Sequence, residues 1–279
     1  MAEDVTPTPP VPALFGQAAS PAPVASEPEP EPPQATPHRY RFLFVYSLLG
    51  AVLAVGIAGL VVFAGGAINP GPSWSSWKPS GGGEGAAKQI ADHVGKAYRL
   101  PTGEQLVDVI AKSPAVSPAS TVNIPIHYIA IKALKGQSYQ TFAISSSNSI
   151  MYSLCGLGQS CAIASGKASV ERGTLVRREI LELALYTFKY TGIKSVIAFM
   201  PPTPGTQPKY VVYLQKNDVA PQLRTPLANT LGPKVPLPAT IPAREVHTID
   251  ASTESRVYSF SLSQAQTGDA ILVLSPLAA

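Results

Sequence analysis

The segment from Val170 to Tyr190 is VERGTLVRREILELALYTFKY. Within it, Val176, Ile180, Leu183 and Thr187 recur at the spacing of one helical face. Ser169 precedes the segment and belongs to the residue types that cap helix N-termini. This pattern predicts a long helix over 170–190. Arg178 and Glu182 stand four residues apart on it, and we expect an exposed ion pair contributing roughly 0.3–0.5 kcal/mol.

Runs of β-branched and aromatic residues lie on both sides of this helix. They predict strands over residues 105–111, 122–133, 139–145, 150–154, 195–200, 210–214, 256–263 and 270–274. Pro125 cannot donate to a β ladder, so an edge strand or a bulge is expected there. Strands in runs, interrupted by one long helix, indicate an α+β domain with a largely antiparallel sheet.

Two further helices are predicted in this domain, which we place at residues 86–279. One covers 86–98, where apolar residues recur at helical spacing before Pro101. The other is shorter and covers 219–231, with Asp218 as its cap, although Pro226 argues against its continuity. Residues 231–242 are proline-rich and are predicted to be a connection within the domain.

An uncharged apolar segment, FLFVYSLLGAVLAVGIAGLVVFAGGAI, covers Phe42 to Ile68. A helix rises about 1.5 Å per residue, so about 20 residues cross a bilayer core of about 30 Å. A cleaved signal peptide would have a shorter apolar core, nearer the start of the chain. The length therefore favours a single uncleaved transmembrane helix over 42–68, with the lipid bilayer as its partner.

The flanks of this segment predict its orientation. His38, Arg39 and Arg41 precede it, whereas Lys78 is the first charge after it. Because positively charged flanks stay inside, we expect a cytoplasmic N-terminus and an extracytoplasmic C-terminal domain at the plasma membrane. Residues 69–85 (NPGPSWSSWKPSGGGEG) are predicted to be a linker, with Trp74 and Trp77 at the outer headgroup layer.

Charge and proline content divide the chain at the apolar segment. Residues 1–41 carry five acidic residues and two arginines, and prolines crowd residues 1–37, so we expect a disordered cytoplasmic head. Residues 69–279 carry 19 Lys and Arg against 12 Asp and Glu. This basic tail could meet an anionic polymer or lipid surface. No dense basic cluster with interleaved aromatic residues indicates nucleic-acid binding.

Cys155 and Cys161 are the only cysteines, in the sequence CGLGQSC. Both lie on the predicted outer side, where disulfides persist, and the glycines between them favour a tight loop. We therefore expect a structural disulfide. The spacing differs from the C-x-x-C of redox sites, and zinc would need further ligands that the neighbouring sequence lacks.

No catalytic, metal or cofactor-binding residue is predicted, although a few histidines and acidic residues have suitable side chains. His93 is expected on a helix surface and His127 half-buried on a strand. His247 near Asp250 lacks any nucleophile motif. Glu179 and Glu182 could act as paired acids, but salt-bridged surface residues are the simpler interpretation.

The segment YSLCGLGQSC…GKASVERGTLVRREILELALYTFKY resembles uncharacterised single-pass membrane proteins of actinobacterial-type envelopes. These share a proline-rich head, one span and an extracytoplasmic Cys-pair domain. The resemblance implies a bacterial plasma membrane but no known activity. The sequence thus favours a membrane-anchored envelope interaction or scaffolding protein, more readily non-enzymatic than enzymatic. An envelope hydrolase with an unrecognised site and a single-pass signal transmitter stay open as alternatives.

Overall fold

The computed structural model of this 279-residue chain describes residues 46, 47, 49, 52, 73–116, 124–133 and 138–277. The chain divides into two units, Met1–Ile68 and Asn69–Ala279. In the first unit, Tyr46, Ser47, Leu49 and Val52 are helical. The rest of the predicted head and span lies outside the described residues. No helix within the described residues is long and apolar enough to cross a membrane, so the span stays a prediction.

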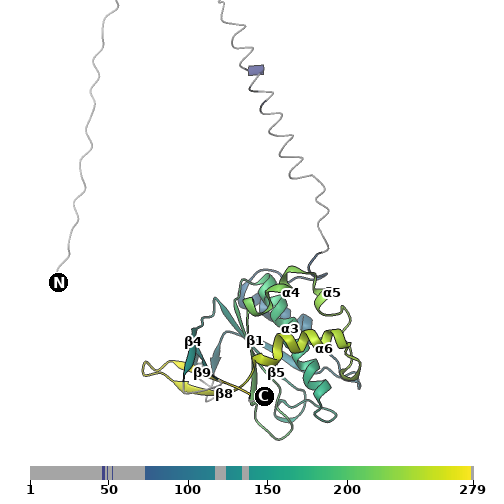
Figure 1. Ribbon diagram of the computed structural model, residues 1–279, viewed down its shortest axis with the longest axis vertical. Coiled ribbons are helices and arrows are strands. Elements are labelled where there is room, and N and C mark those ends of the chain that lie inside the picture. The colour runs from purple at the N-terminus through teal and green to yellow at the C-terminus, as the bar shows by residue number, and fades with distance from the viewer. Residues whose placement is uncertain are drawn as a thin grey trace, which may run out of the picture. The chain divides into compact units, whose positions relative to one another are not determined.

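The second unit is an α+β domain in which helices and strands alternate irregularly along the chain (Figure 1). Its helices are α2 (Gly83–Gly95), η1 (Gln159–Cys161), α3 (Val170–Tyr190), η2 (Lys216–Val219), α4 (Ala220–Arg224), α5 (Leu227–Thr230), η3 (Pro238–Thr240), α6 (Ala243–Thr253) and η4 (Glu254–Arg256). Its strands are β1 (Asp108–Lys112), β2 (Ala115–Val116), β3 (Ile124–Lys132), β4 (Tyr139–Ala143), β5 (Ser149–Cys155), β6 (Ser195–Phe199), β7 (Tyr210–Gln215), β8 (Val257–Gln264) and β9 (Ala270–Pro276).

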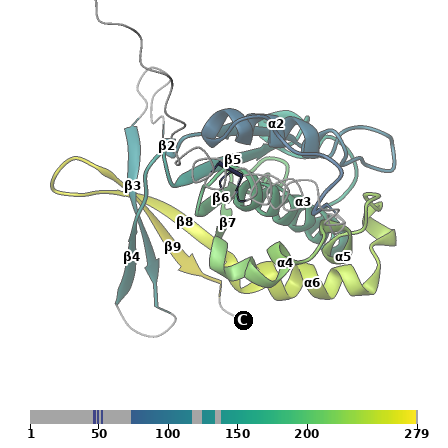
Figure 2. The same ribbon diagram turned by 90° about the horizontal axis from the view of Figure 1, so that it is seen from above.

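The strands form one sheet in the order β1-β5-β6-β7-β8-β9-β3-β2, with β4 also paired to β3. Because only Ser113 and Pro114 separate β1 from β2, the chain itself brings the two ends of this order together. The side chain of Glu84 on α2 accepts hydrogen bonds from the Ser113 backbone and hydroxyl at this junction. The sheet is therefore curled into a nearly closed barrel (Figure 2).

The sheet is mixed, which refines the sequence-based expectation. The α+β class is confirmed, and most neighbouring strands are antiparallel. However, β5 pairs with β6 in parallel, and β3 pairs with β9 in parallel. A parallel pair needs a long crossover, and α3 supplies it between β5 and β6.

Alternating side chains of the central strands enter two separate apolar clusters. Val196 of β6 and Val212 of β7 belong to the cluster under the helices. Ile197 and Val211 belong to a second cluster on the opposite face of the sheet. Since successive strand residues point to opposite faces, strands buried on both sides lack the polar alternation of a half-exposed sheet.

Helix α3 begins and ends as the sequence predicts. The Ser169 hydroxyl accepts a hydrogen bond from the Arg172 backbone N–H, as expected for an N-cap. The helix ends before Gly192, whose φ of 78° suits a residue without a side chain. Helices α2, α3 and α6 gather on one side of the molecule, and the β3–β4 and β8–β9 hairpins extend away from them (Figure 2).

The predicted linker is wrong from Trp74 onward. Trp74 is buried in the main core, and its ring meets Tyr186 and Tyr190 edge-on at centroid distances of 5.5 and 5.7 Å. Trp77 stacks on His93, with ring centroids 3.9 Å apart. The expected position of both tryptophans at the lipid headgroups is therefore not needed to bury them. The aromatic rings of Tyr186 and Tyr190 on α3 offer an apolar surface on which residues 73–80 pack.

Several helix boundaries also differ from those predicted. Helix α2 begins at Gly83, inside the predicted linker, and ends at Gly95. The helix predicted over 219–231 is divided near Pro226 into α4 and α5, as the position of this proline predicts. Asp218 does not cap α4; it accepts a hydrogen bond from Gln215 N and forms an ion pair with Arg256. Helix α6 was not predicted.

Candidate functional site

A pocket of about 760 Å³ opens between α3 and α6. We call it the α3–α6 pocket. Elements from distant parts of the sequence line it: the first turns of α3, the starts of β7 and β8, the C-terminal half of α6, and the end of β9. Its lining includes Arg177, Tyr210, Asp250, Ala251, Glu254, Ser255, Val257 and Leu277. This size lies within the range of about 300–1,000 Å³ that is usual for ligand sites.

An ion pair forms the charged part of the α3–α6 pocket. Arg177 Nη2 lies 2.7 Å from Asp250 Oδ1, with 16% of the arginine side chain and 37% of the aspartate side chain exposed. Arg177 also donates to the hydroxyls of Thr174 and Thr253, each at 3.3 Å. The contacts to Asp250 and Thr253 hold the guanidinium against α6, and the contact to Thr174 lies within α3, so the charge of Arg177 is already neutralised within the domain.

The walls of the α3–α6 pocket are largely apolar. Met200, Val257 and Pro276 line it, together with Tyr210 and Leu277, which are each 44% exposed. Large exposed apolar side chains beside a concave surface are typical of binding sites. The walls therefore suit a ligand with an apolar body.

A smaller pocket of about 130 Å³ adjoins the first, since Gly173 and Met200 line both. We call it the side pocket. Ser169, Arg172 and Thr203 provide its polar lining, and its apolar lining includes Val176, Ile163 and the prolines of the loop after β6. Residues of the first turns of α3 thus line both pockets.

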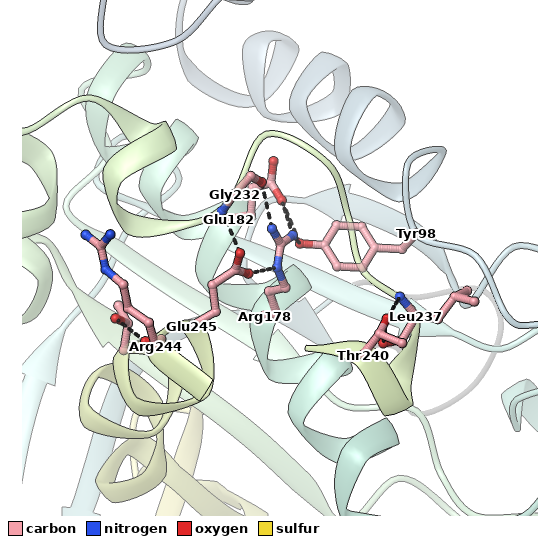
Figure 3. Close-up of polar contacts among 9 residues, drawn as sticks. Tyr98, Arg178, Glu182, Gly232, Leu237, Thr240, Arg244 and Glu245 are labelled. Carbon is pink, nitrogen blue, oxygen red and sulfur yellow. Dashed lines mark hydrogen bonds and ion pairs between the residues drawn. The ribbon is translucent and has the colours of Figure 1, made fainter. Parts of the chain in front are cut away.

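A buried polar network holds α6 against α3 beside these pockets (Figure 3). Arg178 is fully buried, and its Nε donates to Glu245 Oε2 at 2.7 Å. Its Nη1 donates to the Tyr98 hydroxyl at 2.6 Å and to Glu182 Oε2 at 3.2 Å. Its Nη2 donates to the backbone carbonyl of Gly232 at 2.9 Å. Because Glu245 is in the first turn of α6 and Asp250 follows five residues later on the same helix, this network positions the acidic side of the α3–α6 pocket.

The electrostatics of this network favour charged arginine and a retained tyrosine proton. Burial alone would lower the pKa of Arg178, but the nearby Tyr98 and the carboxylates raise it. Burial, reinforced by the Glu182 charge, raises the pKa of the Tyr98 hydroxyl well above its usual value. Burial also raises the pKa of Glu182, while its hydrogen bond from Tyr98 opposes that shift. The predicted exposed Arg178–Glu182 pair is thus wrong: it is part of a buried network.

Glu179 is buried beside this network, and neither of its carboxyl oxygens has a hydrogen-bond partner within the described part of the chain. Burial, and secondarily the Glu182 charge, raises its pKa well above the usual value. A neutral carboxylic acid is the form that such a site accepts. The expectation of a surface glutamate is therefore wrong.

His93, His127 and His247 line neither pocket. His247 is exposed on α6 and does not line the α3–α6 pocket, although Asp250 does. His127 Nδ1 lies 2.9 Å from Asp269 Oδ1 on the distant β3 and β8–β9 side. His93 is exposed and stacked on Trp77.

The predicted Cys155–Cys161 disulfide is confirmed, with the two Cα atoms 4.5 Å apart. It joins the end of β5 to η1, on the approach to α3. Gly156 is required there, because a Cβ at that position would collide with the carbonyl of Ala162. The disulfide lies outside both pockets.

Sequence reasoning missed both pockets, and the signal that could have found part of them is α6. Residues 243–253 place Val246 and Ile249 at helical spacing after a proline, a pattern typical of a helix start. The sequence matches no protein-family model, no curated protein and no solved structure.

Proposed function

We propose that this chain is a membrane-anchored binding protein of the bacterial cell envelope. Its extracytoplasmic domain holds a ligand in the α3–α6 pocket and performs no chemistry on it. The observation that carries the proposal is the pocket itself: about 760 Å³, apolar walls, and a few polar groups at one side. The anchor is the predicted transmembrane helix over Phe42–Ile68.

The arrangement of polar groups favours binding over hydrolysis. Ser255 lines the α3–α6 pocket, but no histidine is among the described residues that line it. Arg177 and Asp250 pair with each other, and the other carboxylate of the pocket, Glu254, has no hydrogen bond to Ser255 within the described residues. Glu179 is buried in the core and does not line either pocket. A nucleophile without a base is a poor catalyst.

The disulfide is consistent with the extracytoplasmic placement, because disulfides persist in oxidising compartments. Protease added to intact cells should remove the domain at 73–277 and spare the N-terminal head. Cleavage of the head alone would reverse the proposed orientation.

Site-specific photocrosslinking in the native membrane tests the binding role. A photoreactive residue replaces Ala251, which is exposed and lines the α3–α6 pocket, in the full-length chain. The matched control replaces Asp108, which is exposed on β1 and lines neither pocket. We expect an adduct at position 251 that is absent at 108 and that diminishes when Tyr210→Ala removes one pocket wall. Equal adducts at both positions, or none at 251, would overturn the proposal.

A further inference from the structure

The charges around α3 separate into a free cation and a free anion in neighbouring pockets. Arg172 lines the side pocket, and its guanidinium has no ion-pair or hydrogen-bond partner among the residues described. Glu254 lines the α3–α6 pocket, and its carboxylate likewise has no partner in the described chain. The Arg177–Asp250 pair also lies in the α3–α6 pocket and carries no net charge.

The lining that the two pockets share is apolar and consists of Gly173 and Met200. Val176 and Met200 lie on the side-pocket side, and Met200 continues into the α3–α6 pocket beside Val257. A ligand that crosses this surface would therefore meet a positive group, an apolar floor and a negative group in that order. Charge complementarity at such a surface selects among ligands more strongly than it adds affinity.

We propose that the ligand is an extended peptide segment with an acidic side chain in the side pocket at Arg172, an apolar middle, and a basic side chain at Glu254. This inference rests on the proposed binding function and names its ligand class. The side pocket, with a volume of about 130 Å³, has room for one carboxylate side chain. The open α3–α6 pocket has room for the longer apolar and basic side chains.

Binding of synthetic peptides to the full-length chain in detergent tests this inference. The probe is acetyl-Glu-(Leu)n-Lys amide with about one to three leucines, a series that varies the separation of its two charges in steps of about 3.3 Å. Its matched controls replace the Glu, the Lys, or both by Gln. We expect the doubly charged probe to bind most tightly. Losing one charge should weaken binding about fivefold, which is the effect of an exposed ion pair near the upper end of the usual range.

Variants of the protein assign each end of the peptide. Arg172→Gln should abolish the preference for Glu over Gln at the first position and leave the preference for Lys. Glu254→Gln should abolish the preference for Lys over Gln at the last position and leave the preference for Glu at the first. Glu171→Gln and Lys167→Gln are the controls, since both residues are exposed near Arg172 and line neither pocket. They should leave both preferences unchanged.

The outcomes separate this inference from the proposed function. If no probe binds at millimolar concentration, or if the charged and neutral probes bind equally, the peptide class is wrong. The proposed function is decided independently by the adduct at position 251. If the controls change the preferences as much as Arg172→Gln does, the charges act at long range and the assignment of the two ends fails.

Discussion

Arg178 Nε donates a hydrogen bond of 2.7 Å to Glu245 Oε2, and both side chains are buried between α3 and α6 (Figure 3). The preceding residue, Arg177, reaches the other part of α6 at Asp250. Two consecutive arginines thus hold the same helix at two points. One contact lies in the core and the other in the α3–α6 pocket, so the stability of the domain and the shape of the pocket are coupled through α6.

Arg178→Met should destabilise the domain by about 3–5 kcal/mol, because it leaves Glu182 and Glu245 buried without their cation. Urea unfolding of the full-length chain measures the change. The double variant Arg178→Met, Glu245→Gln should regain part of the loss, since one uncompensated charge is removed. Arg172→Met is the matched control and should change stability by no more than about 0.5 kcal/mol. Equal losses for Arg178→Met and Arg172→Met would contradict the buried network.

Glu179→Gln should stabilise the domain increasingly as the pH rises from about 5 to 8. The pKa of Glu179 is raised above its unfolded value, so the folded state binds more protons than the unfolded state in this range. The stability of the wild type therefore falls with rising pH, by at most about 1.4 kcal/mol per pH unit from this group. Unfolding curves at several pH values measure the difference.

The control for Glu179 is Glu171→Gln on the same helix. The pKa of Glu171 is lowered by hydrogen bonds from its own backbone N–H and from Ser169, and its side chain is exposed. The contribution of Glu171 to stability is present above its unfolded pKa and is lost as the pH falls. The stability of Glu171→Gln relative to wild type should therefore not increase toward pH 8. A pH-independent difference between wild type and Glu179→Gln would show that Glu179 is not held neutral.

Trp74→Ala should cost about 3–5 kcal/mol, the usual effect of removing a large buried aromatic ring. The ring packs edge-on against Tyr186 and Tyr190, so its removal leaves a cavity beside them. In the Trp77→Phe background, fluorescence reports Trp74 alone: its emission should be blue-shifted and resistant to quenching by iodide. An emission that iodide quenches as readily as free tryptophan would place the ring in a flexible linker instead.

The Cys155→Ser, Cys161→Ser variant should lose less than about 3 kcal/mol, because the disulfide closes a short loop. The chain should nevertheless fold, since the Gly156 and Gly158 backbone hydrogen bonds of this loop do not depend on the sulfur atoms. The disulfide itself is tested on the wild-type protein. Alkylation of this protein, denatured but not reduced, followed by mass spectrometry should show no modified cysteine. Two alkylated thiols would contradict the disulfide.

The local features of the domain could be predicted because they depend on neighbouring residues. The periodicity of 170–190 and the Ser169 cap specify α3, and β-branched runs specify most strands. The Cys155–Cys161 pairing follows from two cysteines within one short loop. Helix α6 has a helical pattern too, but the proline-rich residues before it are more typical of a connection than of a helix start.

The candidate pockets could not be predicted, because they require elements that are distant in the sequence. Arg177 and Asp250 have an ordinary local pattern, and only the packing of α6 on α3 brings them together. Arg172 and Glu254 are likewise far apart in the sequence. Only the tertiary structure places them in two pockets that share the apolar lining at Met200.

The sequence by itself determined the α+β class, the long helix, the disulfide, and an uncharged segment long enough to predict a membrane anchor. The tertiary structure alone decided which charges are buried. Arg178 pairs with Glu182 one turn away, as the helical spacing allows, yet its burial depends on Tyr98 and Glu245, which are 80 and 67 residues distant. Helical spacing fixes the distance between neighbouring side chains, but the water around them is removed only by whatever packs against the helix from elsewhere in the chain.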